Sequence, residues 1–200
     1  AYMDRFFTFG EIDRYSAAFA SWLQSQGLAR GARVAIMMPN VVQYPIALAG
    51  VLRAGHVVVN VNPLYTPREL EHQLKDSGAK AIVIIENFAT TLEQCITHTP
   101  VKHVVLCAMG DQLGLLKGAL VNYVVRNVKK MVPAFNLPDA VRFNEAIARG
   151  TRGTLKPAML KPDDIAVLQY TGGTTGVAKG AILLHRNVIA NVLQSEAWND

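Results

Sequence analysis

Short apolar runs rich in Val and Ile recur through the first half of the chain, and segments with helical spacing of apolar residues separate them. The runs contain four to six residues each and occupy positions 34–38, 56–61, 81–85 and 103–106. Continuous apolar runs of this length are typical of parallel strands buried on both faces, whereas half-exposed strands alternate apolar and polar residues. Because strands and helices alternate, the sequence predicts an α/β fold, with a mainly parallel sheet covered by helices on both faces.

Helix-start signals precede several of the intervening segments. Thr8 and Glu11 have the spacing of a capping box, and Thr66 and Glu69 repeat it with Pro67 in the first turn. Apolar positions at intervals of three and four complete the pattern. The expected helices cover residues 8–27, 41–54, 66–78 and 88–97.

The composition describes a chain that can bury a large core. Half of the residues are apolar, 18% are charged, and the mean hydropathy is +0.19, which excludes disorder over most of the length. The two cysteines, Cys95 and Cys107, cannot form a disulfide framework or a four-cysteine zinc site and indicate a reducing compartment. No basic and apolar leader opens the chain, so no secretory signal is expected and the predicted location is cytoplasmic. The chain begins at Ala1 and ends at Asp200 inside an apolar-periodic stretch, so we expect a piece of a longer protein.

An uncharged stretch at 34–52 has the length of a membrane span, which needs about 20 residues. Pro39, Asn40, Gln43 and Pro45 interrupt it, and its pattern divides into a strand and a short helix. A transmembrane span is therefore not expected.

Positive charge is concentrated in residues 101–162, which hold ten basic and three acidic residues. Within this region, 108–162 is rich in Gly, Pro and basic residues and has weak periodicity, apart from a helix expected over 113–132. That helix carries four basic side chains and no acidic one: Lys117, Arg126, Lys129 and Lys130. Two interpretations stay open, an interfacial helix that contacts the anionic inner face of a membrane or a surface helix with solvated charges. Nucleic acid is not an expected partner, because the segment lacks interleaved aromatic residues and a recognisable binding module.

A loop rich in Gly and Thr follows a predicted strand that ends at Tyr170, and a second apolar run lies at 181–184. The glycines allow backbone N–H groups to converge on an anion, and threonine hydroxyls add donors and can bind a hard cation such as Mg²⁺. Lys179 adds a positive charge, so the loop is suited to a polyphosphate. It lacks the Gly-Lys-Ser/Thr sequence of a Walker A loop, so we expect a hairpin between two strands. The alternative is a Gly- and Thr-rich hairpin that binds no ligand.

The segment 170–180, Tyr-Thr-Gly-Gly-Thr-Thr-Gly-Val-Ala-Lys-Gly, resembles the phosphate-binding signature of the adenylate-forming acyl-CoA synthetases, which belong to the AMP-binding superfamily. Segments 8–12, 52–55 and 60–70 are similar to further motifs of this family, so the resemblance covers almost the whole chain. The Gly-Gly form of the loop is typical of the long-chain bacterial members.

The resemblance implies part of the large N-terminal domain of such an enzyme. Residues 1–162 would be its first α/β subdomain, and 163–200 would begin the following part, with the remainder of the enzyme absent. Many relatives have Ser at the position of Gly173 and Pro at that of Ala178. These two departures predict a more mobile loop, and one phosphate contact must then come from elsewhere.

The resemblance also implies a two-step reaction on a long-chain fatty acid, with ATP, Mg²⁺ and coenzyme A. The carboxylate attacks the α-phosphorus of ATP to give an acyl-adenylate and pyrophosphate, and the thiol of coenzyme A then displaces AMP. The isolated 200 residues are expected to be inactive, because later catalytic residues of the family lie beyond them. A ligase for an aryl or shorter acid, or a non-catalytic nucleotide-binding module, remains as an alternative. Family members are often dimeric, so a homodimer is a further expectation.

By the same resemblance, Lys179 and Thr174 are the expected catalytic residues, and Thr174 is also the expected contact to Mg²⁺. The expected nucleotide-binding residues are Tyr170, Thr171, Gly172, Gly173, Thr174, Thr175, Gly176, Val177, Ala178, Lys179, Gly180 and Ala181.

Overall fold

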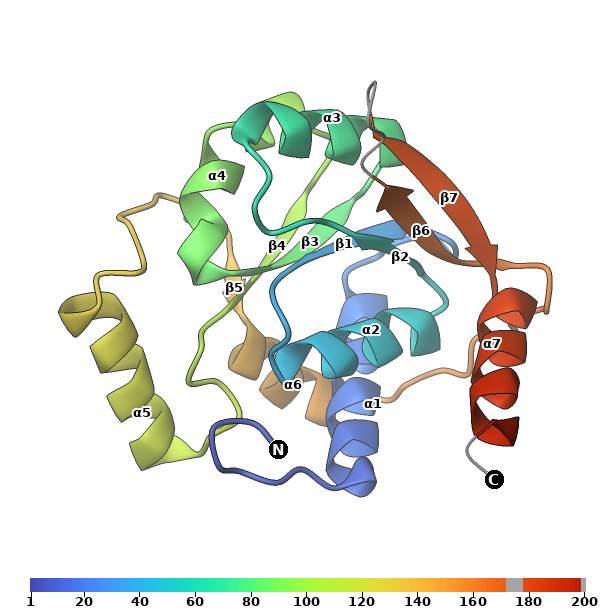
Figure 1. Cartoon of the computed structure of the whole chain (residues 1–200), viewed down its shortest axis with the longest axis horizontal. Helices are drawn as coiled ribbons and strands as arrows, with labels where there is room; N and C mark the ends of the chain where they lie inside the picture. The colour runs from blue at the N-terminus through green and yellow to red at the C-terminus, as the bar shows by residue number, and fades with distance from the viewer. Residues whose placement is uncertain (172–177, 199–200) are drawn as a thin grey trace.

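Within residues 1–171 and 178–198, which the computed structural model describes, the strands form one seven-stranded sheet in the order β5-β4-β3-β1-β2-β6-β7 (Figure 1). Neighbouring strands are parallel except for β6 and β7, which pair in antiparallel orientation. The strands are β1 (Arg33–Met37), β2 (Val57–Asn60), β3 (Ala81–Ile85), β4 (His103–Cys107), β5 (Val141–Arg142), β6 (Ile165–Thr171) and β7 (Lys179–Leu184).

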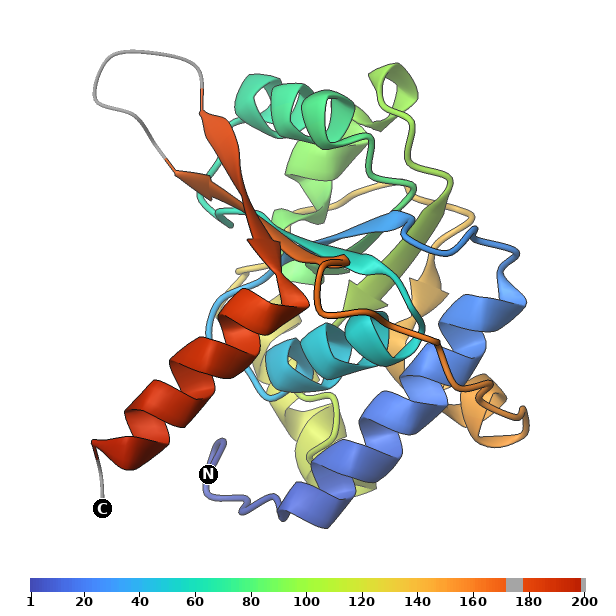
Figure 2. The ribbon, with the colours of Figure 1, turned by 90° about the vertical axis from the view of Figure 1, so that its right-hand side faces the viewer.

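Helices cover both faces of the sheet, as Figure 1 shows. One face holds α1 (Phe9–Ser25), α2 (Gln43–Arg53) and α6 (Phe143–Thr151), and the other holds α3 (Pro67–Ser77) and α4 (Ala89–Glu93). The 3₁₀ helices η1 (Glu86–Phe88) and η2 (Ile96–His98) flank α4. Helix α5 (Leu115–Tyr123) with the π-helix η3 (Val124–Val128) lies to one side of these layers (Figure 1). Helix α7 (His185–Ala197) follows β7 away from the body (Figure 2). The predicted α/β fold is confirmed.

Two hydrophobic cores lie above and below the sheet, because successive residues of a buried strand point to opposite faces. In β1, Val34 and Ile36 join the core under α1, α2 and α6, and Ala35 and Met37 join the core under α3 and α4. Phe19 of α1 is fully buried, and its ring centroid lies 5.8 Å from that of Trp22 and 5.2 Å from that of Phe143. The contact between Phe19 and Phe143 packs α1 against α6, although the two residues are far apart in the sequence.

Both predicted capping boxes are present. The Thr8 hydroxyl accepts a hydrogen bond from the backbone N–H of Glu11 (3.1 Å), and the Glu11 carboxylate accepts one from the backbone N–H of Thr8 (2.9 Å). Thr66 and Glu69 repeat this reciprocal pair at the start of α3. Local sequence signals therefore fix the starts of these two helices.

The order β2-β1-β3-β4-β5 is that of a doubly wound sheet, extended beyond β2 by β6 and β7. The sheet is continuous across the expected division at residues 162 and 163, because β2 pairs with β6. In such sheets, ligands bind outside the carboxyl ends of the strands. The carboxyl end of β6 leads directly into the Gly- and Thr-rich loop.

Three expectations for the helices need correction. The single helix expected at 88–97 is divided into η1, α4 and η2, because α4 ends at Glu93 and i→i+3 hydrogen bonds replace the α-helical ones around Cys95, from its N–H to the Leu92 carbonyl and from the His98 N–H to its own carbonyl. The helix expected over 113–132 begins at Leu115 and ends at Val128, with its last five residues in π geometry. The weakly periodic region 108–162 contains β5 and α6, which the sequence reasoning missed because a two-residue strand has no period and the Arg142 N-cap makes no side-chain capping bond.

The uncharged stretch 34–52 folds as most of β1 and α2, as expected. None of the helices in the described parts of the chain combines the length and apolar character that crossing a bilayer requires.

Candidate nucleotide-binding site at the β6–β7 hairpin

The two strands that flank the Gly- and Thr-rich loop are paired, as the hairpin prediction requires. Tyr170 lies opposite Gly180, and Thr171 lies opposite Lys179 at the end of the pairing. Of the predicted nucleotide-binding residues, six lie outside the described residues: Gly172, Gly173, Thr174, Thr175, Gly176 and Val177. The remaining six lie on β6, on β7 or, for Ala178, immediately before β7.

Thr171 and Lys179 form the last cross-strand pair before the loop. Both residues are exposed, and directly opposed residues of an antiparallel pair present their side chains on the same face. Within the described residues, no carboxylate forms an ion pair with Lys179. A hydroxyl donor and an unpaired ammonium group therefore stand together at the mouth of the loop, which is a suitable arrangement for a phosphate.

Tyr170 fastens the hairpin to the rest of the sheet. Its side chain is buried, and its hydroxyl donates a hydrogen bond to Oδ2 of Asp76 on α3 at 2.5 Å. Burial and then the Asp76 carboxylate raise the pKa of Tyr170 well above its ordinary value of 10.0, so the hydroxyl keeps its proton at neutral pH. The hydrogen bond joins the last turn of α3 to the carboxyl end of β6, immediately before the loop.

A polar network under the hairpin joins the carboxyl ends of β2 and β6. Asn60 donates from Nδ2 to Oε1 of Gln169 at 2.8 Å, in register with it across the two strands. Oδ1 of Asn60 accepts from the Tyr44 hydroxyl at 3.0 Å, and the backbone carbonyl of Asn60 accepts from Nε2 of Gln73 at 2.7 Å. Burial raises the pKa of Tyr44, so this hydroxyl is also a donor at neutral pH. The network joins α2, α3, β2 and β6 at the carboxyl ends of the two strands, where the loop begins.

These positioning residues were not among the predicted site residues. A signal for two of them was visible, because Asn60 and Gln169 interrupt otherwise apolar strands near their carboxyl ends. Asp76 had no such signal, since it lies in the polar last turn of a helix.

Mg²⁺ is an expected ligand of the hairpin, and its usual protein donors are oxygen atoms such as those of carboxylates. The described ranges contain no group of three or more His, Cys, Asp or Glu side chains placed to hold a metal ion. A cavity of about 730 Å³ lies at the opposite, amino-terminal end of β2, between α1, α6 and residues 153–159, and its lining includes none of the predicted site residues.

Comparisons with known proteins confirm that the similarity covers almost the whole chain. The model of the AMP-binding enzyme family matches residues 1–200. The long-chain-fatty-acid–CoA ligase of Escherichia coli O157:H7 is 58% identical over 196 residues, which are 98% of this chain and 35% of that protein. The chain thus spans about a third of the length of the curated relatives it matches.

Solved structures share the same fold. The crystal structure of a long-chain-fatty-acid-CoA ligase from Archaeoglobus fulgidus has a TM-score of 0.71 and 25% identity, covering 96% of this chain and 34% of that one. An anthranilate CoA ligase in complex with anthranoyl-AMP has a TM-score of 0.74 and 22% identity, covering 93% and 31%. Since the family model matches residues 1–200 and the solved relatives share the fold, this chain belongs to the AMP-binding enzyme family.

Proposed function

We propose that the protein to which this chain belongs converts a long-chain fatty acid, ATP and coenzyme A into acyl-CoA, AMP and pyrophosphate through an acyl-adenylate. The observation that carries the proposal is the 58% identity to a long-chain-fatty-acid–CoA ligase over 98% of the chain. The hairpin geometry supports it independently. Thr171 and Lys179 are the last cross-strand pair before the loop, and they lie at the carboxyl end of β6, where ligands bind in sheets of this kind.

The proposed first step is an in-line displacement at the α-phosphorus of ATP. The fatty-acid carboxylate forms the new P–O bond, and pyrophosphate leaves with the electron pair of the broken P–O bond. Lys179 neutralises charge on the β- and γ-phosphates, and Thr171, Thr174 and Thr175 donate hydrogen bonds to them. In the second step the coenzyme A thiol loses its proton, attacks the acyl carbonyl and expels AMP.

A magnesium ion is part of the proposal, with Thr174 as its protein contact. Mg²⁺ is usually held by one or two protein oxygens together with substrate phosphates and water. In the proposal, the protein supplies one threonine hydroxyl, and the described ranges contain no cluster of carboxylates. This donor set fits an ion that the phosphates hold for the most part. When bound, such an ion supplies charge neutralisation to the departing pyrophosphate.

We propose the same division of the chain that the family resemblance implies. Residues 1–162 would form the first α/β subdomain of the AMP-binding domain, and 163–200 would begin the next part with the hairpin. A cytoplasmic location and a homodimer complete this part of the proposal, and sedimentation velocity of the intact protein tests the homodimer.

Peripheral contact with an anionic membrane is proposed through α5 and η3. Six large apolar side chains in and next to these helices are more than half exposed: Leu115, Leu116, Leu120, Tyr123, Val128 and Met131. Exposed lysines follow at 129 and 130. Co-sedimentation with anionic vesicles tests the contact. We expect the double variant Lys129→Gln and Lys130→Gln to bind less than wild type, and equal binding would contradict the contact.

Formation of acyl-CoA by the intact protein tests the substrate class. We expect thioester formation from palmitate and little from benzoate or acetate. Thioester formed only from benzoate or acetate would favour a ligase for an aryl or shorter acid, and no thioester from any acid would favour a non-catalytic nucleotide-binding module.

A further inference from the structure

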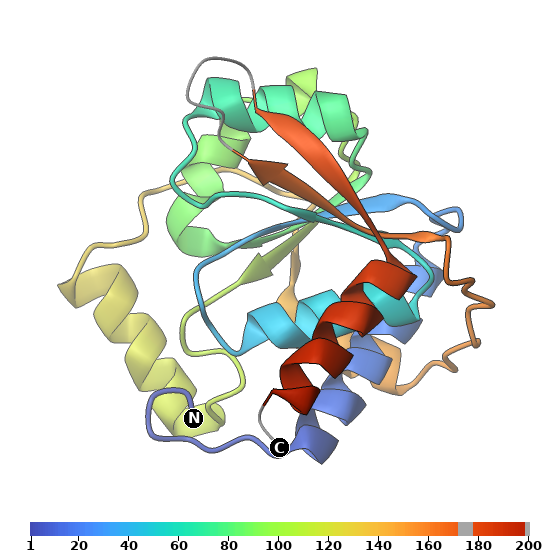
Figure 3. The same cartoon turned by 45° about the vertical axis from the view of Figure 1, so that its right-hand side comes forward.

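Residues 115–128, which comprise α5 and η3, form a segment that we call the arm. It lies beside the sheet and not over either face (Figures 1 and 3). In the whole arm, Gly118 and Val125 are the buried residues. Apolar burial is the force that usually holds a helix to a domain, so the arm must be held mainly by other contacts.

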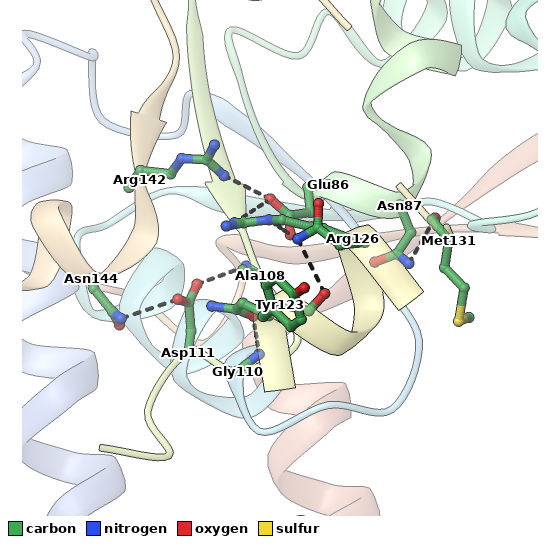
Figure 4. Close-up of polar contacts among 12 residues, drawn as sticks. Glu86, Asn87, Ala108, Gly110, Asp111, Tyr123, Arg126, Met131, Arg142 and Asn144 are labelled. Atoms are coloured by element: carbon green, nitrogen blue, oxygen red, sulfur yellow. Dashed lines mark hydrogen bonds and ion pairs between the residues drawn. The ribbon is translucent and has the colours of Figure 1, made fainter. Parts of the chain in front are cut away.

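Polar contacts attach the arm, and an ion pair is the strongest of them. Nε and Nη2 of Arg126 each lie 2.8 Å from a carboxylate oxygen of Glu86, which is fully buried (Figure 4). Such a two-pronged contact is stronger than a single neutral hydrogen bond. One amide contact within the arm supports it, from the Gly110 N–H to Oδ1 of Asn122 at 2.7 Å, and just beyond the arm Asn87 donates to the Met131 carbonyl at 3.1 Å. We call the contact between Arg126 and Glu86 the tether.

The tether has an unusual property, because Glu86 has a second arginine. Nη1 of Arg142, in β5 of the sheet, lies 2.8 Å from Oε2 of the same carboxylate (Figure 4). Breaking a buried ion pair is normally costly because one charge stays buried without a partner. Here Glu86 keeps Arg142 when Arg126 leaves, so the tether can open without that penalty.

The backbone also sets the arm apart from its surroundings. Left-handed conformations occur just before it, at Gln112 (φ 66°) and Gly114 (φ 86°), and just after it, at Lys130 (φ 51°). Non-glycine residues in this region are strained and concentrate at functional and switching segments. The last five residues of the arm form a π-helix, a rare form that is frequently found at functional sites. The arm is thus bounded at both ends by backbone that departs from regular structure.

The free face of the arm fits an anionic lipid surface. Its apolar side chains are exposed, basic residues accompany them, and no acidic residue occurs between Asp111 and Asp139. An apolar face beside positive charge without negative charge matches the interface of an anionic bilayer.

We propose that the arm is a detachable lipid-binding element. The tether holds it against the body, anionic lipid draws it away, and Arg142 keeps Glu86 paired after release. This inference rests on the peripheral membrane contact proposed above and adds the mechanism by which the contact is controlled.

Hydrogen exchange of the intact protein without lipid tests the tether. Arg126→Gln should raise exchange of the arm amides roughly tenfold or more, while amides of 81–85 and 103–107 keep their wild-type rates. Arg142→Gln is the matched control, since it removes the other arginine from the same carboxylate, and it should leave arm exchange unchanged. No increase in Arg126→Gln, or an equal increase in both variants, would overturn the tether.

Affinity for vesicles of phosphatidylcholine and phosphatidylglycerol tests the release. Arg126→Gln should bind several-fold more tightly than wild type, although it has lost a positive charge, because no tether has to be broken. If wild type binds the vesicles and this variant binds equally or more weakly, the release mechanism is wrong. The membrane contact is then still supported. No binding by either protein would overturn the membrane contact itself, and the release with it, whatever the exchange experiment shows of the tether.

Discussion

The ring of Tyr170 lies directly against Gly180 on the neighbouring strand, so closely that a β-carbon at position 180 would come within 2.9 Å of Cε2 of the tyrosine. The same tyrosine is bonded to α3 through Asp76. The ring cannot shift without disturbing that bond. Position 180 therefore requires glycine, because any side chain there would clash with the ring of Tyr170.

Gly180→Ala should lower the free energy of unfolding by about 1–3 kcal/mol, because an added methyl group overpacks the contact with Tyr170. Urea unfolding measures the change. Gly10→Ala is the matched control, since its nearest neighbour beyond the adjacent residues would be 3.9 Å away, and alanine favours the helix in which it lies. Similar losses in both variants would show that the close approach to Tyr170 is not the cause.

Tyr170→Phe should lower the free energy of unfolding by about 1.5–3 kcal/mol, because it removes a hydrogen bond to a carboxylate. A double-mutant cycle with Asp76→Asn isolates the pair. We expect the double variant to lose clearly less than the sum of the two single losses. Strict additivity would mean that the two side chains do not interact in solution.

Lys179→Ala should reduce kcat/KM for adenylation by the intact protein by roughly 10²-fold, because removing one charged donor from a developing anion typically has this effect. Lys80→Ala is the control. Lys80 is exposed and precedes the amino-terminal end of β3, so it lies at the end of the strands opposite to the hairpin loop. Equal activity of the Lys179 variant and wild type would remove Lys179 from the proposed mechanism.

Asp111 should make stability depend on pH. Burial raises its pKa from 3.8 to about 6, so the folded chain holds the proton more strongly than the unfolded chain between these values. Stability therefore falls as pH rises from about 4 to about 6, by up to about 3 kcal/mol, and levels off above pH 6. Subtracting the unfolding free energy of Asp111→Asn from that of wild type at each pH isolates this contribution. A difference that stays constant from pH 4 to pH 7 would contradict the raised pKa.

Much of the fold could be predicted because its signals are local. The capping boxes at Thr8 and Thr66 and the apolar runs of β1 to β4 need only a few neighbouring residues, and all of them are present. Helix α6 was not predicted although its buried residues Phe143, Ala146, Ile147 and Gly150 recur at helical spacing, because this short helix has no side-chain cap at its start and lies in a region rich in Gly, Pro and basic residues.

The tether shows what local patterns do not contain. Glu86 and Arg126 lie 40 positions apart, and a sequence pattern treats Arg126 as one of four surface charges. Only the folded chain shows that its guanidinium contacts the buried carboxylate of Glu86, whereas Lys129 and Lys130 are exposed and form no such ion pair within the described residues. The same holds for Tyr170 and Asp76, which are 94 positions apart. The loop motif gave the chemistry of the candidate site, and the three-dimensional fold supplied the residues that position it.

Acid-dependent exchange between ATP and pyrophosphate, measured with the intact protein and fatty acids of graded chain length, tests the central claim most directly. We predict exchange that requires an acid, rises with chain length and is strongly reduced in Lys179→Ala. Absence of exchange with every fatty, aryl and short-chain acid would contradict adenylation chemistry at this hairpin.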